Sequence, residues 1–407
     1  MQTRFWWLVP VLTVAVFIPG LASAAEDSGE VKVSDLDAWL AKPPSERGPA
    51  PTTALSRAQA EQTVKALAAE QLAALKAARA AEIEARSITL EGKTLRWLEK
   101  EFGKAEPGQR SLWISMHGGG GAPAAVNDQQ WRNQIRLYQP AEGIYLAPRA
   151  PSDTWDLWHQ GHVDPLFVRL IEGMVATRGV NLDRVYLMGY SAGGDGVWQL
   201  APRMADRFAA AAMMAGHPNE SSVVGLRNLP IALFVGGNDA AFNRNKIVAA
   251  KGAELDALHK ADPKGYTHLV RVYEGLPHWM NLKDAEAVPW MAQFQRVAWP
   301  EKIVWRQDNV VHEQFYWLKI PAGSGKADQQ ITATASGHEI IIEGDVPAGL
   351  TLQLSDALVD LDAPLTVKIN GKVVHEGTVP RTAAAIANAL NQRADAKLCP
   401  SAVLTLK

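Results

Sequence analysis

A serine set between glycines gives the clearest chemical signal in the sequence. Ser191 lies at the centre of Gly189-Tyr190-Ser191-Ala192-Gly193, a G-x-S-x-G pattern. An apolar run precedes the pattern and a stretch typical of a helix follows it, which is the context that a nucleophile elbow requires. Such a turn lifts the serine hydroxyl out of the sheet. The pattern therefore predicts that Ser191 is a nucleophile, and chance occurrence in a glycine-rich chain is the alternative.

A serine nucleophile needs a histidine base and an acid that orients it. Where a nucleophile elbow is used, these residues follow in the order serine, acid, histidine. Asp239 comes shortly after the apolar run 231–235. His278 comes shortly after the next apolar run, 269–273. We therefore expect Asp239 and His278 to complete a triad with Ser191. The competing acids and histidines lie in a helical stretch or at the beginning of a strand, and they are Asp256, Asp262, His259 and His268.

Four glycines after an earlier apolar run are candidate donors to an oxyanion. Residues 117–121 read His-Gly-Gly-Gly-Gly, as in the loop that supplies such donors in lipases and esterases. A phosphate-binding loop would end in Gly-Lys-Ser or Gly-Lys-Thr, whereas Ala122-Pro123 stands here. A flexible loop without function is the other alternative. The expected donors are the backbone N–H groups of Gly118, Gly119, Gly120 and Ala192.

Four side chains near the expected site are candidates for binding substrate: Trp155, Trp158, His217 and Trp279. Trp155 and Trp158 lie after an apolar run, where they form either an acyl or sugar pocket or ordinary packing under a loop. His217 follows another such run, and Trp279 is adjacent to His278. The expected chemistry needs no cofactor. We also expect no metal site, because no second cluster with ligand spacing accompanies three potential ligands, His159, His162 and Asp164.

The elements that must position these residues follow a regular pattern. Between residues 111 and 300, short apolar runs end in polar or glycine-rich turns and alternate with helical stretches. Continuous apolar strands separated by helices are typical of a parallel sheet covered on both faces. We therefore predict a doubly wound, mostly parallel α/β sheet whose ligand site lies beyond the carboxyl ends of its strands. The expected strands are 112–116, 143–147, 184–188, 209–214, 231–235 and 269–273.

The pattern changes at about residue 300, where short strands replace the alternation. Asn370-Gly371 between two apolar runs predicts a tight hairpin, and a single strand is expected over 315–320. We divide the chain into a signal peptide (1–24), a linker and N-terminal helix (25–89), a catalytic α/β domain (90–300) and a small β-rich C-terminal domain (301–407). We expect the last to perform no chemistry. It either covers an apolar face of the catalytic domain or binds a polymer or glycan.

The N-terminus and the composition limit where the protein acts and on what. Arg4, an apolar run over 5–18 and Ala22-Ser23-Ala24 predict a cleaved secretory signal, and therefore an exported protein. A membrane anchor is the alternative, but the run is shorter than the ~20 residues that span a bilayer. We therefore expect no stable membrane insertion after cleavage. The net charge is −2 with scattered charges, so no nucleic-acid footprint is present. Cys399 is the only cysteine, which excludes a disulfide within the chain.

The longer strings 190–196 (Tyr-Ser-Ala-Gly-Gly-Asp-Gly) and 216–220 (Gly-His-Pro-Asn-Glu) add a family resemblance. Together with the triad candidates, they resemble bacterial exported esterases of the α/β-hydrolase superfamily, related to the poly(3-hydroxybutyrate) depolymerase and prolyl-oligopeptidase-like branches. The resemblance covers about residues 90–300. It implies hydrolysis of a small or polymeric carboxylic ester through an acyl-enzyme. A serine peptidase and a non-catalytic binding protein on the same scaffold are the alternatives, and the oligomeric state is left open.

Overall fold

The computed structural model describes residues 35–407. The expected signal peptide, 1–24, lies outside the described residues, so export stays a prediction. Residues up to 47 belong to one unit, whose described part holds helix α1 (Asp35–Leu40) and the short 3-10 helix η1 (Pro44–Glu46). Residues 48–407 form a second compact unit, which contains every candidate site residue. Among residues 35–407, no helix combines the length and apolar character needed to cross a bilayer.

Helix α2 (Arg57–Ala85) precedes the sheet, as the sequence predicts. At its start the Ser56 hydroxyl accepts a hydrogen bond from the Gln59 N–H, and the Gln59 side chain accepts one from the Ser56 N–H. This capping box satisfies two backbone donors that have no partner within the helix. Near its end, Glu82 accepts two hydrogen bonds from Arg169, at 2.9 and 2.7 Å. Just before its start, the Leu55 N–H donates to the carbonyl oxygen of Arg381 at 2.9 Å, so the helix is tied to the body of the second unit at both of its ends.

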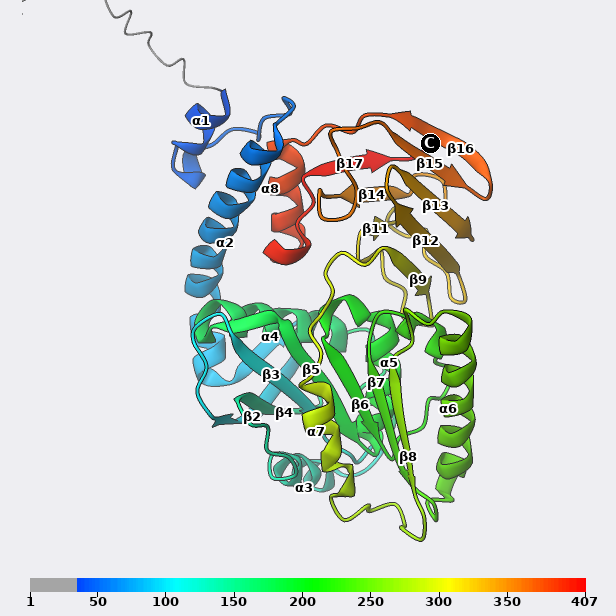
Figure 1. The fold of residues 1–407 in the computed structure, drawn as a ribbon. Coiled ribbons are helices and arrows are strands. Elements are labelled where there is room, and N and C mark those ends of the chain that lie inside the picture. The colour runs from blue at the N-terminus through cyan, green and yellow to red at the C-terminus, as the bar shows by residue number, and fades with distance from the viewer. Residues whose placement is uncertain (1–34) are drawn as a thin grey trace, which may run out of the picture. The chain divides into compact units, whose positions relative to one another are not determined.

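An eight-stranded sheet forms the centre of this second unit (Figure 1). Its order is β1-β2-β4-β3-β5-β6-β7-β8, and all neighbours from β4 to β8 are parallel. This confirms the predicted mostly parallel sheet. The strands are β1 (Ser87–Leu90), β2 (Lys93–Phe102), β3 (Arg110–Met116), β4 (Gly143–Arg149), β5 (Val180–Tyr190), β6 (Ala210–Met214), β7 (Ile231–Gly236) and β8 (His268–Tyr273).

The antiparallel strands β1 and β2 are the part of this sheet that the sequence did not predict. They lie at one edge, where β2 pairs with β4. In β2, polar and charged residues interrupt the apolar ones, and the buried Leu95 and Trp97 flank the exposed Arg96. Neither strand therefore forms a continuous apolar run in the sequence.

Helices cover both faces of the sheet, which confirms the doubly wound arrangement. Helices α4 (Val163–Arg178), α5 (Ala192–Arg203) and α6 (Arg244–Ala261) contribute to one apolar core. Residues after α3 (Ala124–Gln134) and within α7 (Ala287–Met291) contribute to the other. Alternate residues of each strand separate the two cores, as side chains in a strand point to opposite faces. Further 3-10 helices are η2 (Ala205–Arg207), η3 (Val223–Leu226), η4 (Ala241–Asn243), η5 (Lys283–Glu286) and η6 (Ala396–Leu398).

Residues after about 300 form two smaller sheets and one helix, as the β-rich prediction requires. One sheet has the order β16-β15-β13-β12-β9 and the other β10-β11-β14-β17. Asn370 and Gly371 both have positive φ, at 47° and 81°, in the predicted hairpin turn. The elements are β9 (Lys302–Arg306), β10 (Gln314–Phe315), β11 (Leu318–Lys319), β12 (Gln330–Ser336), β13 (Glu339–Gly344), β14 (Thr351–Leu354), β15 (Leu365–Ile369), β16 (Lys372–Gly377), α8 (Ala383–Gln392) and β17 (Ala402–Thr405).

The expectation of a single strand over 315–320 is wrong. Tyr316 has φ = 50°, and the chain folds back there so that Phe315 pairs with Leu318. The turn carries Tyr316 into contact with η2, where its hydroxyl donates to the carbonyl oxygen of Ala205 at 3.1 Å. Its N–H donates to the Asp206 carboxylate at 3.3 Å. The aromatic residues of this segment therefore join the C-terminal sheets to the larger sheet.

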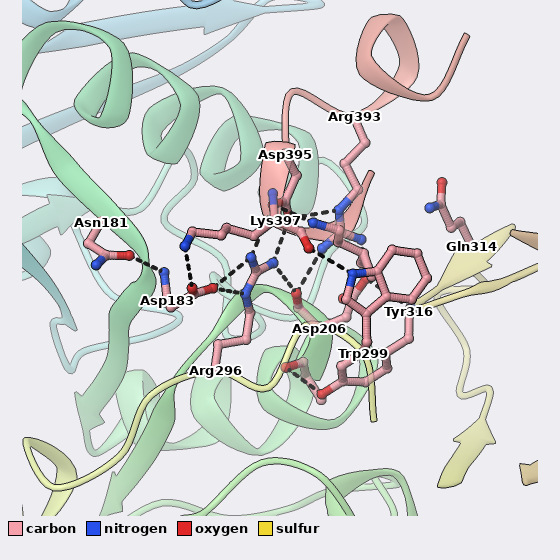
Figure 2. Close-up of polar contacts among 12 residues, drawn as sticks. Asn181, Asp183, Asp206, Arg296, Trp299, Gln314, Tyr316, Arg393, Asp395 and Lys397 are labelled. Atoms are coloured by element: carbon pink, nitrogen blue, oxygen red, sulfur yellow. Dashed lines mark hydrogen bonds and ion pairs between the residues drawn. The ribbon is translucent and has the colours of Figure 1, made fainter. Parts of the chain in front are cut away.

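A buried network of ion pairs strengthens this connection (Figure 2). Arg296 lies between Asp183 of β5 and Asp395 near the C-terminus, with shortest N–O distances of 2.9 and 2.5 Å. Arg393 forms an ion pair with Asp206 and donates to its carbonyl oxygen. Burial alone would favour a protonated Asp395, yet the guanidinium groups of Arg296 and Arg393 hold the pKa of this carboxyl well below its usual range. The network thus places paired charges among largely buried residues.

Asp395→Asn tests the network, because it leaves the Arg296 guanidinium buried beside a neutral group. Removing one partner of a buried pair costs about 3–5 kcal/mol, so we expect a loss of that size in the free energy of unfolding, measured in urea. Asp328→Asn is the matched control, since Asp328 pairs with Arg306 but is 85% exposed. The control should cost less than about 1 kcal/mol. Equal losses in the two variants would contradict a stabilising role for the buried network.

Candidate active site

Ser191 lies at a sharp turn between β5 and α5, with φ = 58° and ψ = −121°. This backbone conformation is rare for a residue with a side chain, and such strain is found at functional sites. The Ser191 N–H donates to the carbonyl oxygen of Met214 on β6 at 2.9 Å. A Cβ at Gly193 would lie 2.1 Å from the carbonyl oxygen of Met116, so only glycine lets the helix begin this close to β3. These contacts fix the turn that presents the hydroxyl.

The structure brings the three expected triad residues together. His278 Nε2 lies 3.0 Å from Ser191 Oγ, and His278 Nδ1 lies 2.7 Å from Asp239 Oδ2. With a proton on Nδ1 donated to the carboxylate, Nε2 is left to accept the serine proton. Asp239 is 2% exposed, and its other oxygen lies 3.7 Å from Arg244 Nη1. The side chains come from the ends of β5, β7 and β8, so the sheet itself sets their spacing.

Tyr190 holds the loop that carries His278, a role that the sequence did not reveal. Its hydroxyl donates to the carbonyl oxygen of His278 at 2.6 Å and accepts from the N–H of Met280 at 3.1 Å. Its ring packs edge-on against the His278 ring, with centroids 5.9 Å apart. Burial raises the pKa of Tyr190, so the phenol stays protonated and can donate. The G-x-S-x-G pattern treats this position as a spacer, which is why it carried no signal.

His117 orients the glycine loop through hydrogen bonds to two backbone groups. Its Nε2 accepts a hydrogen bond from the Ala150 N–H at 3.1 Å, so the proton of the neutral ring is on Nδ1. Nδ1 donates that proton to the carbonyl oxygen of Gly118 at 2.6 Å. In a trans peptide the C=O and the next N–H point in opposite directions, so the Gly119 N–H points away from His117. The histidine therefore sets the direction of one candidate oxyanion donor.

Asn127 of α3 binds both backbone groups of Gly120, and this contact overturns one expectation. Its Oδ1 accepts the N–H of Gly120 at 3.1 Å, and its Nδ2 donates to the Gly120 carbonyl oxygen at 3.0 Å. The Gly120 N–H is thus already bonded, and the prediction that it binds an oxyanion is wrong. Gly119 has φ = 118°, and a Cβ there would lie 2.1 Å from Asn127 Oδ1. Gly118 lies against Ser191, where an added Cβ would be 3.0 Å from the serine Cβ.

The Ala192 N–H is the remaining expected donor. Ala192 is the first residue of α5, and the first N–H groups of a helix have no partner within it. The donor lies one residue after the nucleophile, as in enzymes with a nucleophile elbow. Gly119 and Ala192 line one cavity together with Ser191, and Gly118 lines a second one with it, so the N–H groups of all three stay candidate donors.

Two cavities adjoin Ser191, and the four candidate pocket residues do not all line the same one. The larger, about 680 Å³, is lined in part by Tyr190, His278 and Trp279. The smaller, about 330 Å³, is lined in part by Trp155 and His217. Trp158 lines neither, which corrects the prediction that it binds substrate. It is fully buried, and its Nε1–H donates to the carbonyl oxygen of His117 at 3.0 Å.

The competing titratable residues are engaged elsewhere. Asp262 pairs with Arg227 at 2.8 Å, and this hydrogen bond lowers its pKa to about 2. Asp256 Oδ1 lies 3.0 Å from His268 Nε2. Burial raises the pKa of the Cys399 thiol to about 12, which disfavours the reactive thiolate. The other polar pairs that involve competing residues are His259 with the Gly265 carbonyl, and Asp164 with Arg203 and His312.

His117 should make stability depend on pH. Burial lowers its pKa to about 4, whereas the unfolded chain binds the proton near pH 6.5. Because the unfolded chain binds this proton more readily, the folded state is most stable above about pH 6.5, where the ring is neutral in both states. We expect the free energy of unfolding to fall by about 3 kcal/mol as the pH is lowered to about 4. Urea unfolding at pH 7 and pH 4 measures it. In His117→Gln the loss over this range should be smaller by that amount, and equal losses would contradict the assignment.

Comparisons with known proteins give one family match and several similar solved structures. Residues 149–307, which include all three triad residues, match the Dienelactone hydrolase family. No curated protein matches the chain. Similar solved structures include a thermostable esterase, at 20% identity and a TM-score of 0.40 over 52% of this chain and 62% of its own. The present chain therefore spans less than two thirds of that esterase.

Two further structures are similar to about half of the chain. A poly(3-hydroxybutyrate) depolymerase from Bordetella parapertussis is 16% identical, with a TM-score of 0.38 over 51% of this chain and 87% of its own. Esterase 2 from Thermogutta terrifontis is 15% identical, with a TM-score of 0.36 over 51% of this chain and 91% of its own. The sheet order and the turn at Ser191 are those of the α/β-hydrolase fold.

Proposed function

We propose that the protein hydrolyses carboxylic esters through an acyl-enzyme on Ser191. The observation that carries this proposal is the continuous hydrogen-bonded chain from Ser191 Oγ through His278 to the buried Asp239. A nucleophile and a base within hydrogen-bond reach, with the base oriented by a third group, are the signature of an activated serine. The match to a hydrolase family over the same residues supports the proposal.

In the first half of the reaction, His278 Nε2 takes the proton as Ser191 Oγ attacks the ester carbon. Asp239 stabilises the imidazolium that forms and keeps the ring in the reactive orientation. The negative charge on the former carbonyl oxygen is met by the N–H groups of Gly119 and Ala192. His278 then gives its proton to the leaving alcohol, and the acyl group remains on Ser191.

In the second half, a water molecule replaces the alcohol. His278 removes a proton from the water, which attacks the acyl carbon, and the same pair of N–H groups binds the second oxyanion. Collapse of this intermediate returns the proton to Ser191 Oγ and releases the carboxylic acid. The rest of the chain contributes rigidity. His117, Asn127 and Tyr190 hold the donors and the base through hydrogen bonds to backbone groups.

We further propose that the C-terminal sheets support the catalytic unit rather than take part in chemistry. Their buried contacts include those of Tyr316 with η2 and the Arg296–Asp395 pair, and none of these residues belongs to the proposed triad. His312, between β9 and β10, donates from Nε2 to the Asp164 carboxylate at 2.7 Å and does not contact Ser191. The same sheets could support the catalytic unit and also bind a polymeric ester.

Ser191→Ala removes only the nucleophile and should abolish both ester turnover and covalent labelling by a fluorophosphonate. A residual rate far below that of the wild type is expected from the oxyanion donors alone. Initial rates with p-nitrophenyl acetate and gel-based labelling provide the measurements. Unchanged turnover in this variant would overturn the proposal, and faster cleavage of an amide than of the matching ester would indicate a peptidase.

Asp239→Asn should lower kcat by about 10⁴, because an amide favours the wrong tautomer of His278. Asp256→Asn is the matched control. Asp256 also contacts a histidine, but that histidine, His268, is not near Ser191, and the control should keep nearly full activity. Steady-state kinetics on one ester decide between them. A fully active Asp239→Asn enzyme would show that another carboxylate orients the base.

A further inference from the structure

The two cavities beside Ser191 differ in their relation to the base. Among the described residues, His278 lines the larger cavity and not the smaller one, whereas Ser191 and Gly119 line both. The histidine must reach the leaving oxygen to protonate it as the alcohol departs. A leaving alcohol therefore fits the larger cavity, on the side of His278. The acyl group, which stays on Ser191, is then directed into the smaller cavity.

Two exposed aromatic rings line the smaller cavity. Phe242 is 73% exposed and Trp155 is 64% exposed, more than any other phenylalanine or tryptophan among residues 35–407. They come from the loops after β7 and β4, which lie two places from β5 on opposite sides in the sheet order. Exposed aromatic residues that gather at one cavity mark a binding surface, since each ring gains by burying about 150–250 Å².

Phe242 is held in place despite its exposure. Its φ is 55°, and the next residue, Asn243, has φ = 57°. A bulky residue in this region is strained, and such strain persists where the surrounding structure enforces it. The Arg244 guanidinium lies 4.9 Å from the centre of the Phe242 ring and 3.7 Å from Asp239 Oδ1. The ring is thereby fixed relative to the triad acid.

Trp155 is fixed from the other side. An added Cβ at Gly121 would lie 3.5 Å from the Trp155 backbone nitrogen, so this segment packs directly on the glycine loop. The Trp155 ring meets the edge of the His159 ring at a centroid distance of 5.3 Å. Asp153, two residues earlier, accepts a hydrogen bond from Asn127 Nδ2 at 2.8 Å. Asn127 thus forms hydrogen bonds to both the glycine loop and the loop that carries Trp155.

We propose that the smaller cavity is the acyl subsite and that Trp155 and Phe242 select a flat, ring-bearing carboxylic acyl group over a flexible alkyl chain. This inference rests on the proposed ester hydrolysis. During acylation, the bond from Ser191 Oγ to the acyl carbon forms, the bond to the alcohol oxygen breaks, and the serine proton passes through His278 to that oxygen. Water then cleaves the acyl-enzyme while the ring remains between the two aromatic side chains.

The assignment predicts which step each cavity controls. The alcohol has left before the acyl-enzyme is hydrolysed, so only the acyl subsite acts on that step. Trp155→Leu and Phe242→Leu keep an apolar side chain but remove the ring. We expect each to lower the ratio of kcat/KM for p-nitrophenyl benzoate to that for p-nitrophenyl hexanoate by about tenfold, the size typical of a modest change in a pocket. Each should also change the hydrolysis rate of the benzoyl-enzyme in single-turnover measurements.

Two comparison variants sharpen the test. Trp279→Leu removes a ring from the larger cavity, and it should leave the benzoate-to-hexanoate ratio and the hydrolysis rate of the benzoyl-enzyme unchanged while altering acylation. Val373→Ala changes an exposed apolar side chain of β16, outside both cavities, and should leave all rates as in the wild type.

The outcomes separate this inference from the proposed function. If the wild-type protein neither turns over these esters nor reacts with a fluorophosphonate, the proposed function fails and the subsite assignment falls with it. If the wild type is active but the Trp155 and Phe242 variants keep the wild-type ratio, the acyl subsite alone is wrong. A larger change in benzoyl-enzyme hydrolysis from Trp279→Leu than from these variants would reverse the assignment of the two cavities.

Discussion

The candidate site depends on the close backbone approach at Ser191. The chain leaves β5, turns within one residue and begins α5 against the ends of β3 and β6. The Ser191 N–H bonds to Met214, and Gly193 has no room for a side chain beside Met116. This contact fixes the hydroxyl and the Ala192 N–H at once, because both belong to the same turn. The cost of the strained backbone is offset by burial of the surrounding strands, whose residues are almost all inaccessible to solvent.

Most of the remaining site is held through backbone hydrogen bonds rather than contacts between catalytic side chains. Asn127 and Tyr190 each satisfy two backbone groups of the loops that carry the donors and the base. His117 bonds one backbone group of the glycine loop and one just after β4. A buried neutral histidine can donate at one nitrogen and accept at the other, and Tyr190 does the same with one oxygen. Side chains that both donate and accept in this way fix the orientation of the peptide groups that they contact. The orientation of a peptide group decides whether its N–H points toward an oxyanion.

The sequence predicted the parts of the structure that follow from strong local patterns. Continuous apolar runs predicted six strands of the large sheet, and chain order predicted which aspartate and histidine meet Ser191. The edge strands β1 and β2 were not predicted, because polar or charged residues interrupt their apolar residues. Trp158 and Gly120 were misassigned for another reason. A tryptophan near a site, or an N–H in a glycine loop, has the same local sequence whether it faces substrate or is bonded to the protein. Only the position of Asn127 and the packing of α5 decide that.

The most direct test of the account is to find the acyl-enzyme itself. A rapid acid quench after mixing with p-nitrophenyl benzoate, followed by peptide mass spectrometry, reports which residue carries the acyl group. The account predicts one benzoyl group, attached to Ser191, and its absence in Ser191→Ala. Ester turnover with the acyl group on another residue, or with no acyl-enzyme when hydrolysis of the intermediate is slowed, would contradict it.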